Sequence, residues 1–127
     1  MTQEQKELLF KDLCGRLPYG VKISVLSWDE REMEYIDRVD VLYSVNGDEY
    51  IKSTNEDYDF SLEDIKPYLF PLSSMTEEQK SILSLCNAFI EPRSIELKLN
   101  FYNEQHIDYR GLIKKGLAID ATNLNIY

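Results

Sequence analysis

The chain has 127 residues, of which 43% are hydrophobic, and its formal net charge is −9 at pH 7. This length predicts a single domain, residues 1–127, large enough to bury a core of its own. No apolar run approaches the ~20 residues that cross a membrane, and the opening residues have neither the basic start nor the apolar middle of a signal peptide. We therefore expect a cytoplasmic protein that is not associated with a membrane.

The negative charge is confined to the first half of the chain. Residues 1–64 contain 16 Asp or Glu against 7 Lys or Arg, whereas residues 65–127 contain 7 of each kind. An acidic field repels phosphate backbones, so we do not expect nucleic-acid binding, and it attracts a basic protein partner. The alternative interpretation is that the charge only keeps a small domain soluble.

The first predicted element is an N-terminal helix that begins at Thr2. Gln5 follows three residues later, which is the spacing of a capping box. One mostly apolar face of this helix then contains Leu8, Leu9, Asp12 and Leu13.

The segment 17–64 is predicted to be the strand-rich half of the domain. Apolar residues alternate with polar ones along it, and Asn46-Gly47 is a strong hairpin signal. The four predicted strands are 21–27, 32–36, 39–45 and 49–52. Short connections between consecutive strands favour an antiparallel four-strand meander.

A polar loop follows the predicted strands. Asn55, Asp57 and Asp59 mimic the start of a calcium loop, but Phe60 replaces the required glycine and Lys66 stands where the bidentate glutamate should be. One histidine and no cysteine cluster also argue against zinc. We expect neither a metal nor a cofactor.

The segment 65–75 is predicted to be a fixed, extended connector between the strands and a helical half, 76–120. Pro67 and Pro71 each remove a backbone donor and disfavour helix in the residue before. Thr76 then begins a helix with a second capping box. Residues 94–103 fit either a helix or a strand, and we choose a helix. Gly111 and Gly116 frame a further short helical turn, so the predicted class is α+β, with two or three C-terminal helices packed on one face of the sheet.

Three parts of the sequence together resemble a family of uncharacterised small proteins of anaerobic gut bacteria and their phages. The stretches are Leu17–Lys22, then Ile65–Leu69 with Pro71–Glu78, then Asp108–Ile113 with Gly116–Ala118. The resemblance implies a shared fold and a mobile-element setting, and it implies no activity.

The residues with the most chemical potential are His106, Asp108, Tyr109 and Arg110, with Tyr68 as a further candidate for a binding site. A base, an acid and a cation this close together suggest an enzyme or a small-ligand site. No nucleophile motif accompanies them, so we assign no catalytic residue. Our preferred interpretation is structural: Arg110 pairs with Asp108, Asp120 or a backbone carbonyl.

Two function hypotheses follow from these patterns. The first is a small acidic protein-interaction or regulatory module; in one variant the carboxylates of residues 29–64 mimic nucleic acid in a basic site on another protein. The alternative is a small-ligand-binding protein or enzyme that uses His106, Asp108, Tyr109 and Arg110. A concave pocket lined by those four residues would favour the alternative, whereas a flat acidic sheet face with exposed tyrosines would favour the first.

Overall fold

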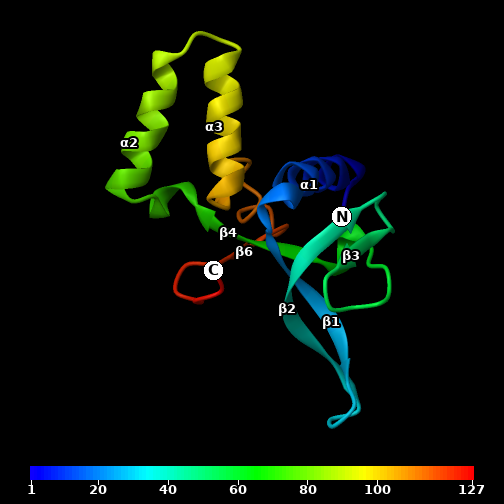
Figure 1. The fold of residues 1–127 in the computed structure, drawn as a ribbon. Helices are drawn as coiled ribbons and strands as arrows, with labels where there is room; N and C mark the ends of the chain where they lie inside the picture. Colours follow the sequence, from blue (N-terminus) through cyan, green and yellow to red (C-terminus); the bar gives the residue numbers. More distant parts are fainter.

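A computed structural model describes all residues from Met1 to Tyr127 and shows an α+β fold (Figure 1). Helix α1 spans Gln3–Arg16, and Thr2 forms the predicted capping box with Gln5. The strands are β1 Lys22–Asp29, β2 Glu34–Val45, β3 Ile51–Ser53, β4 Lys66–Pro71, β5 Ile107–Asp108 and β6 Ile119–Asp120. The later helices are α2 Glu77–Leu85 and α3 Arg93–Glu104. The predicted class and the N-terminal helix are confirmed.

The sheet is mixed, so the predicted four-strand antiparallel meander is wrong. Strands β1, β2 and β3 do form consecutive antiparallel pairs. Strand β4 then pairs antiparallel with β1 but parallel with β5 and β6. These parallel partners are short pieces of the closing part of the chain, and nothing local in the sequence indicates such distant pairing.

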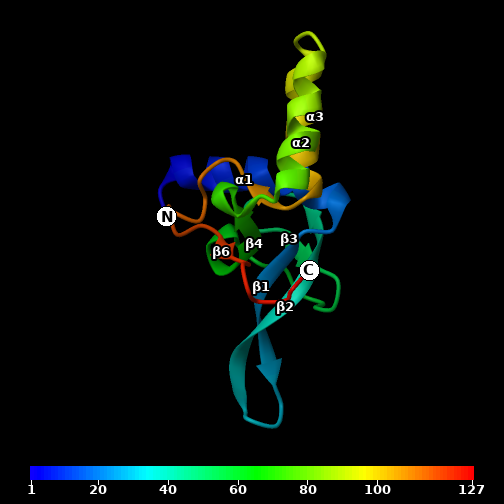
Figure 2. The same ribbon diagram turned by 90° about the vertical axis from the view of Figure 1, so that its left-hand side faces the viewer.

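Strand β2 also differs from the prediction, because it joins two expected strands into one. Residues 32–36 and 39–45 were expected to be separate, yet β2 runs without interruption from Glu34 to Val45. No glycine or proline lies between them to break the strand. The result is a long β1–β2 arm whose tip extends beyond the body of the protein (Figures 1 and 2).

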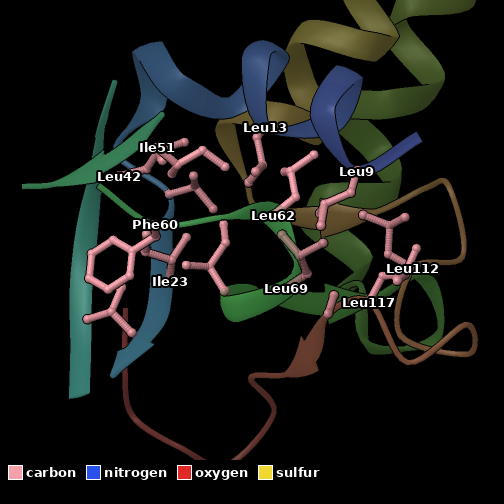
Figure 3. Close-up of a cluster of buried hydrophobic side chains, with 14 residues drawn as sticks. Leu9, Leu13, Ile23, Leu42, Ile51, Phe60, Leu62, Leu69, Leu112 and Leu117 are labelled. Atoms are coloured by element: carbon pink, nitrogen blue, oxygen red, sulfur yellow. The ribbon is translucent and has the colours of Figure 1, made fainter. Parts of the chain in front are cut away.

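One hydrophobic core joins both halves of the chain (Figure 3). Leu9 and Leu13 of α1 lie over the sheet, where they meet Ile23 of β1 and Leu69 of β4. The chain between β5 and β6 adds Leu112. The core side chains are Leu9, Leu13, Val21, Ile23, Val25, Leu42, Ile51, Phe60, Leu62, Ile65, Leu69, Leu112, Leu117 and Ala118.

Helices α2 and α3 form a hairpin that projects from the body, at the opposite end from the β1–β2 arm (Figures 1 and 2). The expected packing of C-terminal helices on one face of the sheet is therefore wrong. The capping box at Thr76 and the helix over residues 94–103 are confirmed. The third expected helix is instead a hydrogen-bonded turn, closed by the Leu117 N–H donating to the Leu112 carbonyl at 2.9 Å.

The base of the helical hairpin reaches the body at a glycine. A Cβ added to Gly15 of α1 would lie 3.1 Å from Nδ2 of Asn103, near the end of α3. Gly15 thus permits a close approach between the first helix and the last one.

We predict that Leu69→Ala will lower the free energy of unfolding by about 2–5 kcal/mol, as expected for a fully buried leucine. Leu72→Ala is the matched control, since Leu72 lies just beyond the same strand and is 44% exposed. Urea denaturation of both variants measures the difference. Equal losses for the two leucines would contradict the central position of β4.

Candidate functional site

The motif Asp108–Gly111 lies where the chain leaves β5, at the base of the helical hairpin. Asp108 is buried, and its carboxylate accepts hydrogen bonds from the N–H groups of Leu112 at 2.8 Å and Ile113 at 2.9 Å. Both carboxylate oxygens therefore hold the turn that carries Leu112 into the core. Asp108 therefore serves as a hydrogen-bond acceptor for backbone N–H groups.

A buried ion pair lies beside this motif. Arg16 and Asp12 of α1 have no exposed side-chain surface, and Arg16 Nε donates to Asp12 Oδ2 at 2.8 Å. The same guanidinium donates through Nη2 to the Ile107 carbonyl at 2.6 Å and through Nη1 to the Tyr102 carbonyl at 3.4 Å. One arginine thus ties α1 to the end of α3 and to β5.

Arg110 and Tyr109, both partly exposed, lie against the buried ion pair. Arg110 Nε lies 3.3 Å from Asp12 Oδ1, so its partner is none of the three expected from sequence. The guanidinium groups of Arg16 and Arg110 lie 5.4 and 4.9 Å from the centre of the Tyr109 ring. Burial raises the pKa of the Asp12 carboxyl, against the opposing effect of the two arginines.

His106 and Tyr68, the other candidates, contribute to a different contact. The His106 ring stacks on the Tyr127 ring, with centroids 4.0 Å apart and planes 14° apart. The Tyr127 hydroxyl donates to the Tyr68 carbonyl at 2.8 Å. Burial, together with the positive charges of Arg16 and Lys22, lowers the pKa of His106 to about 4. The imidazole is therefore neutral near pH 7.

His106, Asp108, Tyr109 and Arg110 line neither of the two best-formed hollows of the protein. A hollow of about 820 Å³ lies along α1, and it is lined by polar residues such as Glu4, Lys11 and Lys115. None of the four candidate residues lines it.

The outward surface of the β1–β2 arm carries a row of exposed apolar side chains. Paired residues share a face of a sheet, and Trp28 pairs with Tyr35 while Leu26 and Val39 lie on the same face by alternation. Ile23 and Val25 face the core on the other side. We call this row the outer sheet face; its members are between 41% and 68% exposed, and they are Leu26, Trp28, Tyr35, Val39 and Tyr43.

The outer sheet face lies in the most acidic part of the chain. Residues 29–64 contain 13 Asp or Glu against 3 Lys or Arg. Trp28 and Tyr35 contact each other edge to face across the two strands, with centroids 5.1 Å apart. Exposed aromatic side chains therefore lie on an arm that carries an excess of carboxylates.

The helical hairpin exposes a second apolar surface. Residues 76–105 contain 5 acidic and 3 basic side chains. Six large apolar residues there are between 37% and 86% exposed: Ile82, Leu85, Phe89, Ile90, Ile95 and Leu99. Monomeric proteins seldom leave so many large apolar side chains exposed on one projecting element.

Comparison of the chain with protein-family models, with curated proteins and with solved structures gives no match. None of its helices combines the length and the apolar character that crossing a membrane requires.

Sequence reasoning missed Asp12, Arg16 and Tyr127 as members of these clusters. A signal for the first two was present, since Asp12 falls on the apolar face of α1 and Arg16 follows one helical turn later. No comparable signal marks Tyr127, because its contacts come from residues far away in the sequence.

We predict that the stability of the protein falls as the pH is lowered from about 6.5 towards 4, in part because of His106. The folded state holds the imidazole neutral in this window while the unfolded chain takes up a proton, so protons favour unfolding. His106→Asn, which tolerates the positive φ of 58° at this position, removes the group. The difference in stability between parent and variant should shrink as pH falls; a difference that does not depend on pH would contradict the assignment.

Proposed function

We propose that this chain is a small acidic interaction module that binds a basic protein partner through the outer sheet face. One observation supports this most: Leu26, Trp28 and Tyr35 stay exposed although the core is complete without them. Exposed aromatic residues that a fold does not need are typical of binding surfaces.

The charge around these residues favours a basic partner over a neutral one. The arm, residues 22–45, contains 6 acidic and 3 basic side chains, and like charge opposes association with another acidic surface. Trp and Tyr supply large contact areas at small entropic cost, and Arg side chains of a partner stack well on such rings. A basic site that normally binds nucleic acid fits this description.

The helical hairpin supports the same class of function. Its exposed apolar residues include Leu85, Phe89 and Ile90 near the tip, far from the outer sheet face (Figure 1). Because the two surfaces project at opposite ends, each can contact a different molecule. We include in this proposal the mobile-element setting that the sequence resemblance implies.

The alternative, a small-ligand site or an enzyme at His106, Asp108, Tyr109 and Arg110, has less support. Asp108 holds backbone N–H groups, and Arg110 lies against Asp12, so neither presents a free functional group to a cavity.

We predict that Trp28→Ser together with Tyr35→Ser will weaken binding to a partner captured from the native host by roughly tenfold or more, because such aromatic residues dominate binding energies. The measurement is titration calorimetry with the purified partner. Tyr19→Ser is the control, since Tyr19 is exposed but lies outside the outer sheet face.

Two double charge-reversal variants test the electrostatic contribution to binding. Glu32→Lys with Glu34→Lys, at the tip of the arm, should weaken the same complex, and the parent complex should weaken as salt is raised. Glu77→Lys with Glu78→Lys, on α2, should leave binding unchanged. A partner that binds all variants like the parent, at any ionic strength, would contradict the proposed surface.

A further inference from the structure

The closing segment, residues 121–127, is held on the body at its two ends. The Ala121 N–H donates to the Leu69 carbonyl at 2.8 Å, and at the other end Tyr127 packs against the sheet. Thr122 to Asn125 between them are exposed. Two contacts anchor the far end of this segment, which we call the strap: the side chain of Tyr127, and a hydrogen bond that Lys22 Nζ donates to the Ile126 carbonyl.

The Tyr127 hydroxyl occupies a gap in the backbone ladder between β1 and β4. The strands pair antiparallel at Ile23 and Pro67, so the next step of the same register would place Lys22 opposite Tyr68. Instead, the Tyr127 oxygen accepts from the Lys22 N–H at 2.8 Å and donates to the Tyr68 carbonyl at 2.8 Å. A phenol thus replaces a direct backbone bond.

Three side chains surround the phenol ring. The His106 ring stacks on one face at a centroid distance of 4.0 Å, Phe70 lies at 5.7 Å, and Lys22 Nζ is 5.5 Å from the ring centre. We call this set of groups the phenol slot: the Lys22 N–H, the Tyr68 carbonyl, and the side chains of Lys22, Phe70 and His106. Burial raises the pKa of Tyr127 to about 12, so the hydroxyl keeps its proton for the Tyr68 carbonyl.

The slot is built from elements that do not depend on the strap. Lys22 follows the buried Val21, Tyr68 precedes the buried Leu69, and the His106 carbonyl accepts from the Phe70 N–H at 2.8 Å. If the ring leaves, the Lys22 N–H and the Tyr68 carbonyl lose their partner while the walls remain. Tyr127 is not part of the hydrophobic core, so the ring can leave without the core opening.

We infer that the phenol slot is a recognition site for a tyrosine ring, in which Tyr127 is an exchangeable resident. The inference is independent of the basic partner proposed for the outer sheet face. A short tether gives Tyr127 an effective concentration on the order of millimolar. A second tyrosine therefore displaces Tyr127 when it too is held near the slot, on a docked protein or on a second copy of this chain. The strap is then released.

The experiment uses the whole chain with Tyr127→Ala, which empties the slot. His106 is the only histidine, so its imidazole proton gives a single, unambiguous NMR signal from the wall of the slot. N-acetyl-tyrosinamide should shift this signal in the variant and leave the parent unchanged at the same concentration. N-acetyl-phenylalaninamide should bind roughly tenfold or more weakly, because it leaves two backbone groups unpaired.

A mixing experiment identifies where the ring comes from. The His106→Asn protein keeps Tyr127 and gives no histidine signal, so it is mixed with the Tyr127→Ala protein. The His106 signal of the Tyr127→Ala protein should shift if Tyr127 of the second copy enters the slot. If the tyrosine amide shifts the signal and the second copy does not, the slot is assigned to a tyrosine of a different protein.

Three results would overturn the inference. They are the absence of any shift in a folded Tyr127→Ala protein, equal binding of the tyrosine and phenylalanine amides, and an equal shift of the His106 signal in the parent when the tyrosine amide is added.

If Tyr127→Ala does not fold, Tyr127→Phe replaces it, since it keeps the ring and loses only the hydroxyl. The tyrosine amide should then displace the phenyl ring of this variant at a lower concentration than it displaces Tyr127 in the parent, and equal concentrations would contradict the slot.

Discussion

The buried pair of Asp12 and Arg16 is the contact on which the rest of the structure depends. Arg16 reaches the carbonyls of Tyr102 and Ile107, which lie 86 and 91 residues further along the chain. Removing one member of a buried ion pair typically costs about 3–5 kcal/mol, since it leaves an unpaired charge inside the protein. This pair therefore fixes the end of α3 and β5 against α1, and with them the turn held by Asp108.

Because α1 and the chain between β5 and β6 complete the core on the sheet, two other parts of the protein extend away from it. The β1–β2 arm and the helical hairpin both extend beyond the body, and both carry apolar side chains that the core does not use (Figures 1 and 2). Both ends are mildly acidic, since the arm (residues 22–45) contains 6 acidic and 3 basic side chains and the hairpin (residues 76–105) contains 5 and 3. Two exposed apolar ends on one body support the proposed interaction module.

Local patterns in the sequence predicted the local structure well. The capping boxes at Thr2 and Thr76 and the alternation of Val21, Ile23 and Val25 indicated the right elements, because each depends on neighbouring residues. The parallel pairing of β4, the contact of Arg110 with Asp12 and the insertion of Tyr127 between β1 and β4 could not be predicted in this way, because each joins distant segments. The outward direction of the helical hairpin was missed for a related reason: an apolar helical stripe predicts that something covers it, but not that the cover lies within the same chain.

Photo-crosslinking from the outer sheet face tests the central claim most directly. A benzoylphenylalanine placed at Tyr35, which is 64% exposed, samples whatever binds the arm, and the same group at Leu124, 48% exposed on the closing segment, is the reference. We expect irradiation in cells of the native host to join the Tyr35 position to one basic protein, with that product absent from the Leu124 position. The same products from both positions, or none from Tyr35, would contradict the account.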